Sequence, residues 1–479
     1  MVFSSTEFLF IFLPVVFLLY YSLPRKTHNV LLLSASLIFY AWGEPVFIGM
    51  MLLSILVNYS LALGIGPIGQ NPQHRKRFLV LMVIFNVGVL FMFKYSIFAV
   101  ENLNALLGVP IPVPKLALPI VGISFFTFKA MSYGIDVYRG ITPAQKRLTH
   151  VALYIAFFPQ LLAGPIVRYH DIAEQIKQRR PTLEKTALGI RRFIVGLAKK
   201  LLIANTMAVV VDKIFSPAEH AVTLSAGDIN FPLAWIATLA YCMQIYFDFS
   251  GYSDMAIGLG KMFGFDIKEN FNYPYTASSI KDFWRRWHIS LSTWFKAYLY
   301  IPLGGNRKGR ARTLLNMWIV FLCTGFWHGA AWTFILWGMF HGLFLMLETT
   351  GIIDTKKFGL KALKHFYTLM VVAIGFTLFR SESITQAFCF IRNMFVGFKS
   401  SAQSAALLGQ VLSPQVMLVF AVSIVAALPV GKDLYQKALN GKRALVWEYT
   451  GYALSFVLLI LCVLNVSSST YNPFIYFRF

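Results

Sequence analysis

The chain has 479 residues, of which 57% are hydrophobic and only 13% are charged. A soluble protein would carry about a quarter charged residues, so the composition excludes an ordinary soluble protein and indicates a polytopic membrane protein. The formal net charge of +23 would favour nucleic acid as a partner of a soluble chain. Here the basic residues fall in short loops between apolar runs, so we expect contact with membrane lipid and no binding of nucleic acid.

The first apolar run precedes a basic cluster at 24–28 and has no basic leader or cleavage site. This order predicts a retained first span with an outer N-terminus. An out-and-back pair, an outward span, a weakly charged outer loop at 101–115 and an inward span follow. The predicted spans of this part are 29–43, 46–66, 78–98 and 118–137.

Residues 150–170 form an apolar segment that Pro159 and the pair Gly164-Pro165 interrupt, with basic residues on both sides. A segment that begins and ends on one side of the membrane predicts a re-entrant element. Such backbone is tolerated at membrane depth only where it is buried in protein or lines a cavity. The polar and basic stretch 168–200 predicts an amphipathic helix on the cytoplasmic face.

The remaining apolar runs surround a long basic and aromatic region at 261–312. No internal repeat is visible, so the inverted-repeat signature of many transporters is missing. The sequence therefore predicts an all-α polytopic protein with about eleven transmembrane helices plus re-entrant and interfacial helices. The further spans are 201–214, 231–260, 313–327, 329–348, 366–380, 384–398, 414–430 and 446–466.

The segment FWRRWHISLSTWF (283–295) places ionisable groups among aromatic ones. On a single helix, its apolar side chains and His288 would share one face. Arg285 and Arg286 would point elsewhere, as the charged face of an interfacial helix, whereas His288 would point into the protein. The residues of the predicted apolar face are Trp284, Trp287, His288, Leu291, Trp294 and Phe295.

The segment CTGFWHGAAWTFILWGMFHG (323–342) is apolar and aromatic but contains His328 and His341. Ionisable groups within membrane segments are costly, about 2.5–3.5 kcal/mol for a central Arg, Lys or Asp, and indicate a functional site by default. The alternative is a buried histidine that a backbone carbonyl satisfies. His341 follows His328 by thirteen residues, so the two cannot share a site on one straight helix.

The segment YFDFSGYSDMAIG (246–258) holds two carboxylates, Asp248 and Asp254, and hydroxyls such as that of Ser250. One interpretation is an internal polar network in which Arg or Lys balances each carboxylate. The other is the wall of a polar tunnel or substrate site.

The segment IPLGGNRKGRAR (301–312) carries Arg307, Lys308 and Arg310 after two glycines, and it lacks the GxxxxGK[ST] pattern of a nucleotide loop. It is either a positive cytoplasmic loop or, together with Arg285 and Arg286, a docking patch for an anionic donor.

Buried imidazoles can perform acid–base chemistry, because burial disfavours their charged form and a neutral imidazole is a general base. His328 could take the proton of a hydroxyl that attacks a carbonyl, while His288 orients the acceptor or hydrogen-bonds the developing oxyanion. The sequence has no GxSxG motif. Its four cysteines lie alone in apolar segments, which indicates no metal site and no covalent acyl carrier. Direct transfer from a thioester to an alcohol is the simplest scheme.

These segments resemble the membrane-bound O-acyltransferase family, and most of all its bacterial alginate O-acetyltransferase branch. The resemblance covers nearly the whole chain, and FWRRWHISLSTW with a downstream WHG is highly specific. Further similar segments are MVFSSTEFLFIFLP, PIVGISFFTFKAMSYGIDVYRG, FFPQLLAGPIVRY, QIYFDFSGYSDMAIGLGKMFGFDIKENFNYPY, YLYIPLGGNRKG, FRSE and NPFIYFRF.

The resemblance implies one transmembrane domain over 1–479 with a central funnel or tunnel, N-terminal spans in 1–150, a catalytic core in 150–348 and C-terminal spans in 349–479. It implies that His328 matches the essential histidine of the family and His288 its second site position. The tunnel or its support would come from Trp284, Trp287, Trp327, Asp248, Ser250, Asp254 and His341.

The same resemblance implies a cytoplasmic acyl-thioester donor, acetyl-CoA, that is not permanently bound. The acceptor would be an extracytoplasmic polysaccharide, reached directly or through a partner of the SGNH-hydrolase type, in the bacterial inner membrane. Acetylation of peptidoglycan or cellulose and D-alanylation of teichoic acid are alternatives within the family. A transporter or flippase, or a scaffold without chemistry, are alternatives of another class.

Overall fold

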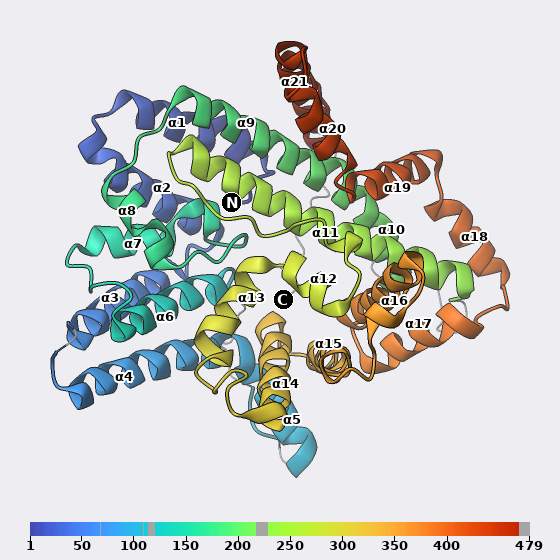
Figure 1. Cartoon of the computed structure of the whole chain (residues 1–479), viewed down its shortest axis with the longest axis horizontal. Coiled ribbons are helices and arrows are strands. Elements are labelled where there is room, and N and C mark those ends of the chain that lie inside the picture. Colours follow the sequence, from blue (N-terminus) through green and yellow to red (C-terminus); the bar gives the residue numbers. More distant parts are fainter. Residues whose placement is uncertain (68, 109, 114–119, 217–228, 469–479) are drawn as a thin grey trace. The chain divides into compact units, whose positions relative to one another are not determined.

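The computed structural model describes residues 1–67, 69–108, 110–113, 120–216 and 229–468 (Figure 1). Those ranges are built from helices and contain no β-strand, which confirms the all-α prediction. The chain divides into two compact units, one of residues 1–193 and 252–269 and the other of 194–251 and 270–479. The single domain predicted over 1–479, with its three parts, stays a prediction.

In the first unit, α3 packs on α4 and α6, and α2 packs on α7. The predicted spans 29–43, 46–66 and 118–137 each correspond to one helix. The span predicted at 78–98 is part of a longer run, because a π-helical turn at Phe91–Tyr95 joins α4 to α5 and only Gly108, in the left-handed region, ends it. The outer loop predicted at 101–115 is therefore helical at its start, and residues 109 and 114–119 lie outside the described residues. The helices are α1 (Leu13–Ser22), α2 (His28–Gly43), α3 (Ile48–Ile65), α4 (Pro72–Leu90), α5 (Ser96–Leu107), α6 (Ile123–Arg139), α7 (Leu148–Ala156) and α8 (Tyr169–Lys177).

The predicted interruption of the segment 150–170 is confirmed. Helix α7 ends at Ala156, a single 3-10 turn covers Phe158–Gln160, and Gly164 takes a positive φ of 97°. The backbone from 157 to 167 is nevertheless buried in the first unit. Irregular backbone of this kind requires a protein environment at membrane depth. Its re-entrant course through a membrane remains a prediction.

The prediction of amphipathic helix over 168–200 is confirmed in part, because the stretch forms two helices and not one. Helix α8 ends at Lys177, and α9 (Leu183–Ala198) continues through a π-helical turn into α10 (Asn205–Phe215) as one apolar run. Two basic residues of this run reach buried carboxylates: the buried Lys200 pairs with Asp248, and the partly exposed Arg192 pairs with Asp254.

The second unit holds the C-terminal helices. The spans predicted at 231–260, 313–327, 329–348, 366–380, 384–398, 414–430 and 446–466 each correspond to a helix, whereas α18 and α20 were not predicted. The helices are α11 (Phe231–Met262, which also contributes to the first unit), α12 (Ile280–Arg286), α13 (Ile289–Phe295), α14 (Gly309–His328), α15 (Trp332–Thr350), α16 (Lys361–Arg380), α17 (Ile384–Val396), α18 (Ala402–Val411), α19 (Pro414–Ala426), α20 (Val430–Leu439) and α21 (Ala444–Ser468).

Helices α14 and α15 form a tight antiparallel hairpin (Figure 1). Small residues make it possible: a Cβ on Gly325 would lie 2.5 Å from the carbonyl oxygen of Phe334, and one on Gly338 would lie 2.4 Å from that of Phe321. Small residues at helix interfaces allow such close approach in membrane proteins. The hairpin turns at Gly329, directly after His328, and so fixes where that histidine lies.

Five helical runs in the described residues are long and apolar enough to cross a membrane, and the bent pair α18 and α19 would make a sixth. The chain is thus a multi-pass membrane protein. The count of about eleven spans stays a prediction, since several helices at predicted spans are shorter or more polar than this criterion requires. The five runs are Ile48–Ile65, Pro72–Leu107, Leu183–Phe215, Lys361–Arg380 and Ala444–Ser468.

Candidate active site

The helix predicted over 283–295 is broken at His288, so the prediction of one continuous helix is wrong. Helix α12 ends at Arg286, α13 begins at Ile289, and His288 between them has φ 44° and ψ 54°, in the left-handed region. That conformation costs a residue other than glycine about 1–3 kcal/mol and is retained where the surrounding structure enforces it, often at functional sites. The enforcing contact is a hydrogen bond from the Ile289 N–H to the Asn270 carbonyl oxygen, 2.9 Å long.

His288 is buried, with 1% of its surface exposed. Its Nδ1 lies 3.2 Å from Oδ1 of Asn270, and Phe249 packs on the imidazole edge to face at 4.6 Å. Its Nε2 has no hydrogen-bond partner among the described residues. Burial lowers the pKa of His288 to about 3, which keeps the ring neutral at physiological pH.

His328 is the last residue of α14 and is also buried. Three aromatic rings surround its imidazole, all nearly perpendicular to it, with centroids 5.0 Å away. They are Trp327 from the same helix, Trp337 from α15 and Phe379 from α16. Edge-to-face is one of the two arrangements that aromatic rings prefer.

The indole of Trp327 connects the two histidines. Its ring centroid lies 5.9 Å from that of His288 and 5.0 Å from that of His328. Two imidazoles forty positions apart in sequence therefore contact one side chain, within one unit of the fold. The arrangement provides two titratable rings in an apolar aromatic surrounding, which suits proton transfer to or from a bound substrate.

His341 belongs to the same aromatic cluster. It lies on α15, and its fully buried ring contacts Trp337 at 5.3 Å and Trp284 at 5.1 Å. Neither of its ring nitrogens finds a hydrogen-bond partner in the described part of the chain. His328 and His341 do not share a straight helix, as expected, but the α14–α15 hairpin brings both to Trp337.

Comparison with known proteins agrees with this architecture. A model of the membrane-bound O-acyltransferase family matches residues 46–391. The chain belongs to this family. It is 41% identical over 510 residues to a protein of Azotobacter vinelandii named probable alginate O-acetylase, with 100% of both chains covered. It is 45% identical over 399 residues to a protein of the same name from Pseudomonas aeruginosa, covering 82% of this chain and 75% of the relative. A peptidoglycan O-acetyltransferase of Helicobacter pylori is 37% identical over 429 residues, which cover 82% of this chain and 80% of the relative.

The protein is accordingly an O-acyltransferase, and its remaining predicted site residues can be placed. Asp248 forms a buried ion pair with Lys200 at 2.8 Å, and the buried Asp254 pairs with the partly exposed Arg192 at 2.6 Å. The interpretation that Arg and Lys balance both carboxylates is confirmed. The two belong to different units, and Ser250, buried in α11, has no partner for its hydroxyl in the described ranges.

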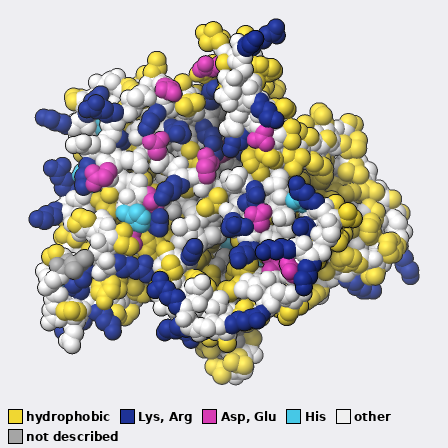
Figure 2. Space-filling model, viewed as in Figure 1, with side chains coloured by type: hydrophobic (Ala, Val, Ile, Leu, Met, Phe, Trp, Pro, Cys, Tyr) yellow, Lys and Arg dark blue, Asp and Glu magenta, His cyan; other side chains and the backbone are white. Residues whose placement is uncertain are grey.

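The basic residues of this O-acyltransferase are mostly on the surface, and Figure 2 shows many Lys and Arg side chains on one face. Arg286 pairs with Asp282 at 3.0 Å, and Arg285 lies 3.6 Å from the same carboxylate. Arg310 donates to the Thr350 carbonyl oxygen. Arg307 and Lys308 are exposed. Within the predicted donor patch, these two exposed cations take no part in the contacts to Asp282 and Thr350.

Sequence reasoning missed Asn270, Phe249, Trp337 and Phe379, each of which contacts a site histidine. Trp337 lies in the same aromatic segment, 323–342, as His328. The many aromatic residues of that segment could therefore have indicated a ring contact to His328. Asn270 and Phe379 lie far from either histidine in the sequence, and only the tertiary fold reveals them.

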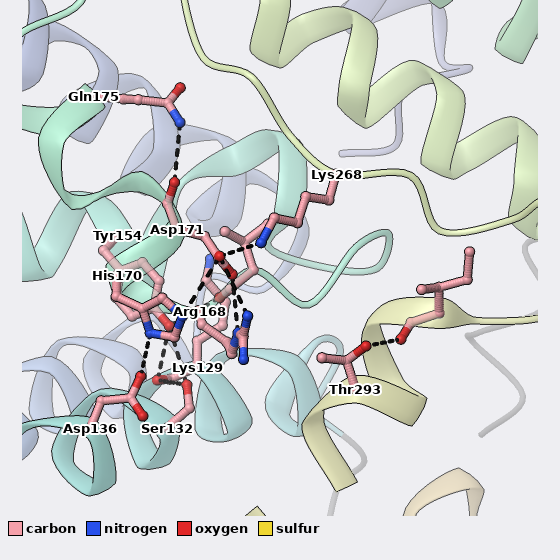
Figure 3. A network of polar contacts seen from close by, with 12 residues as sticks. Lys129, Ser132, Asp136, Tyr154, Arg168, His170, Asp171, Gln175, Lys268 and Thr293 are labelled. Atoms are coloured by element: carbon pink, nitrogen blue, oxygen red, sulfur yellow. Dashed lines mark hydrogen bonds and ion pairs between the residues drawn. The ribbon is translucent and has the colours of Figure 1, made fainter. Parts of the chain in front are cut away.

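A second polar cluster in the first unit was not predicted (Figure 3). His170 of α8 places Nδ1 2.8 Å from Oδ2 of the buried Asp136 of α6. Asp171 accepts hydrogen bonds from Arg168, at 3.1 Å, and from Lys268. Burial raises the pKa of Asp171, but the hydrogen bonds from Lys268 and Arg168 together hold it below its usual value.

Proposed function

We propose that this O-acyltransferase moves an acetyl group from a cytoplasmic thioester, acetyl-CoA, to a hydroxyl of an extracytoplasmic polysaccharide. The acceptor is reached directly or through a serine of an SGNH-hydrolase-type partner. The names of the relatives support polymer acylation, and alginate is the acceptor they favour. The observation that carries the chemistry is the pair of buried imidazoles on the indole of Trp327.

In the reaction, His328 takes the proton of the acceptor hydroxyl as its oxygen attacks the thioester carbonyl carbon. A C–O bond forms, the C–S bond breaks, and the proton passes from the imidazolium to the departing sulfur. His288 acts on the acceptor or on the oxyanion of the tetrahedral intermediate. The aromatic rings around His328 exclude water, which would otherwise compete as the nucleophile.

The donor would bind through the exposed cations of the segment 301–312. Arg307 and Lys308 are free of the ion pair that engages Arg285 and Arg286 with Asp282, so they suit a phosphate-bearing coenzyme. The location would be the bacterial inner membrane, with these cations on the cytoplasmic side.

The test is the acetyl content of the surface polymer in cells that carry His328→Ala. General acid–base groups contribute about 10²–10⁴-fold, so acetylation should fall at least 100-fold at equal protein level. The matched control is His74→Ala, which removes an exposed histidine of α4 and should leave acetylation unchanged. Normal acetylation with His328→Ala would overturn the proposal.

The same experiment separates the alternative acceptors. If the variant lost acetyl groups from peptidoglycan instead, the acceptor would be peptidoglycan, as in the name of the Helicobacter pylori relative. If the variant lost D-alanine from teichoic acid, the acceptor would be teichoic acid and the transferred group would be D-alanyl. Solute uptake by proteoliposomes without any acyl transfer would instead support a transporter.

A further inference from the structure

We propose that Asn270 is a positioning residue that fixes the tautomer of His288, so that Nε2 of this histidine accepts a hydrogen bond from the bound acceptor. The inference rests on the proposed function and decides between the two roles left open for His288. The evidence for this role is the set of hydrogen bonds at the side-chain oxygen of Asn270.

Two donors and one ring nitrogen point at Oδ1 of Asn270, which is fully buried. The Ser290 N–H donates to it at 3.2 Å, the Ser290 hydroxyl at 2.8 Å, and Nδ1 of His288 lies 3.2 Å away. A backbone N–H can only donate, so the Asn270 atom that faces it is the carbonyl oxygen and not the amide nitrogen. The orientation of the amide is thereby determined.

The Ser290 hydroxyl also lies 3.5 Å from Nδ1 of His288, but its one hydrogen goes to the nearer Oδ1 of Asn270, at 2.8 Å. A carbonyl oxygen only accepts, so Nδ1 of His288 carries the hydrogen of the neutral imidazole. The other nitrogen, Nε2, then holds a lone pair and no hydrogen. This Nε2 is buried and has no partner within the described ranges. A buried acceptor that has no hydrogen bond is unfavourable, and a hydrogen bond from the substrate removes that cost.

The backbone holds this geometry in place. The Asn270 carbonyl oxygen accepts from the Ile289 N–H at 2.9 Å, so Asn270 contacts both the residue after His288 and its ring. Phe249 and Trp327 pack against the imidazole at 4.6 and 5.9 Å. A ring confined on these sides cannot turn to present Nδ1 to the substrate without losing the hydrogen bond to Asn270.

The fixed tautomer excludes one role of His288. An oxyanion needs a hydrogen-bond donor, and Nε2 in this tautomer is an acceptor. His288 therefore acts on the acceptor molecule. Because the reacting hydroxyl has one hydrogen and His328 removes it, His288 accepts from a second O–H or N–H of the acceptor. A neighbouring sugar hydroxyl or the backbone of a partner serine provides such a group.

Two substitutions test this assignment. Asn270→Asp keeps the acceptor oxygen but places a negative charge beside Nδ1, which raises the pKa of His288 by about one unit or more. Protonation then occupies Nε2, so the acid limb of kcat/KM should move to higher pH. Asn270→Ala releases the ring, and a misplacement of about 1 Å costs on the order of 100-fold, so kcat should fall with little change in KM for the donor.

The measurement uses membrane vesicles of the producing cells with labelled acetyl-CoA and the de-O-acetylated surface polymer, between pH 3 and 8, because the acid limb of His288 starts from a pKa of about 3. Asn393→Asp is the matched control, since Asn393 lies in the same unit and donates to the Ile229 carbonyl oxygen, away from the histidines. Its pH profile should equal that of the unaltered protein. Activities are normalised to folded protein, and the position of a pH limb does not depend on the amount of enzyme.

An acid limb of Asn270→Asp that coincides with that of the unaltered protein would overturn the inference. Full activity of Asn270→Ala would do the same. Absence of acetyl transfer by the unaltered protein would instead refute the proposed function, so the two failures are distinguishable.

Discussion

His170 in the first unit and the histidines of the candidate site in the second lie in opposite environments. In the first unit, His170 is 27% exposed and lies between carboxylates, with Asp136 at 2.8 Å and Asp171 at 3.7 Å (Figure 3). In the second unit, His288 and His341 are buried among aromatic rings, and three of their four nitrogens find no partner in the described residues.

The comparison teaches which histidine to regard as functional. A polar group with charged partners and partial hydration satisfies the usual requirements of a folded protein. A buried imidazole without partners costs about 1–3 kcal/mol per unsatisfied group, and natural sequences tolerate such costs mainly where function requires them. The polar contacts of His170 therefore indicate a structural role, whereas the unsatisfied nitrogens of the buried His288 and His341 indicate a functional one.

The largest expected effect comes from making the same substitution in both environments. Asparagine tolerates the left-handed backbone at position 288, so His288→Asn should accumulate normally while it removes the Nε2 acceptor. We expect acyl transfer to fall about 100-fold or more, because positioning groups contribute on this scale. His170→Asn should change transfer less than about threefold. If both variants lost acetyl transfer equally, the environment of a histidine would not indicate whether it is functional.

The sequence predicted which segments form the site better than it predicted the backbone conformation and tertiary contacts within them. The aromatic segment 323–342 with His328 and His341 was recognisable, because ionisable residues in apolar runs are rare. The break at His288 was not, since the periodicity of 283–295 suits one helix and the opposing hydrogen bond comes from Asn270. Helical pattern is a local signal, and a tertiary contact from nineteen residues away overrides it.

The cluster around His170 was missed for a related reason. Its members, Asp136, His170 and Lys268, come from three distant segments and form no motif in sequence. Individually each is a common loop or helix-end residue. In contrast, Asp248 and Asp254 lie in an apolar segment, so the need for cationic partners could be predicted, although not which cations.

An intermediate effect is expected where α16 meets the ring of His341. A Cβ added to Gly375 would lie 2.4 Å from Nε2 of His341 and 3.0 Å from Cε1, so Gly375→Ala must displace the imidazole or the helix. Overpacking of this kind costs about 1–3 kcal/mol. The thermal midpoint in detergent should fall, and transfer should fall with it, because His341 packs on Trp337 and Trp337 packs on His328.

Gly409→Ala is the control, since nothing lies within 4 Å of a Cβ at that position in α18. A variant at Gly375 with unchanged stability and activity would show that the third histidine is not held by α16. The aromatic cluster would then be a looser assembly than its ring contacts indicate.

The smallest effect is expected in the charged cluster of the first unit. Asp171 has a folded-state pKa below its unfolded value, so its contribution to stability is present above the ordinary Asp range near pH 4 and is lost as pH falls through the folded pKa. Lys268→Ala removes one hydrogen bond to Asp171 and brings the two pKa values closer. Because Lys268 is 71% exposed, solvent screens the pair, and the loss should be at most about 1 kcal/mol at neutral pH.

Thermal unfolding of Lys268→Ala from pH 2 to 7 checks this prediction. The variant and the unaltered protein should differ at pH 7 and converge at low pH, where Asp171 is protonated in both. A difference that grows as pH falls would have the wrong sign. Acyl transfer at neutral pH should be unaffected, because the charged groups of this cluster pair with one another and not with a substrate. Nε2 of His288, in contrast, is an unsatisfied acceptor that can take a hydrogen bond from the substrate.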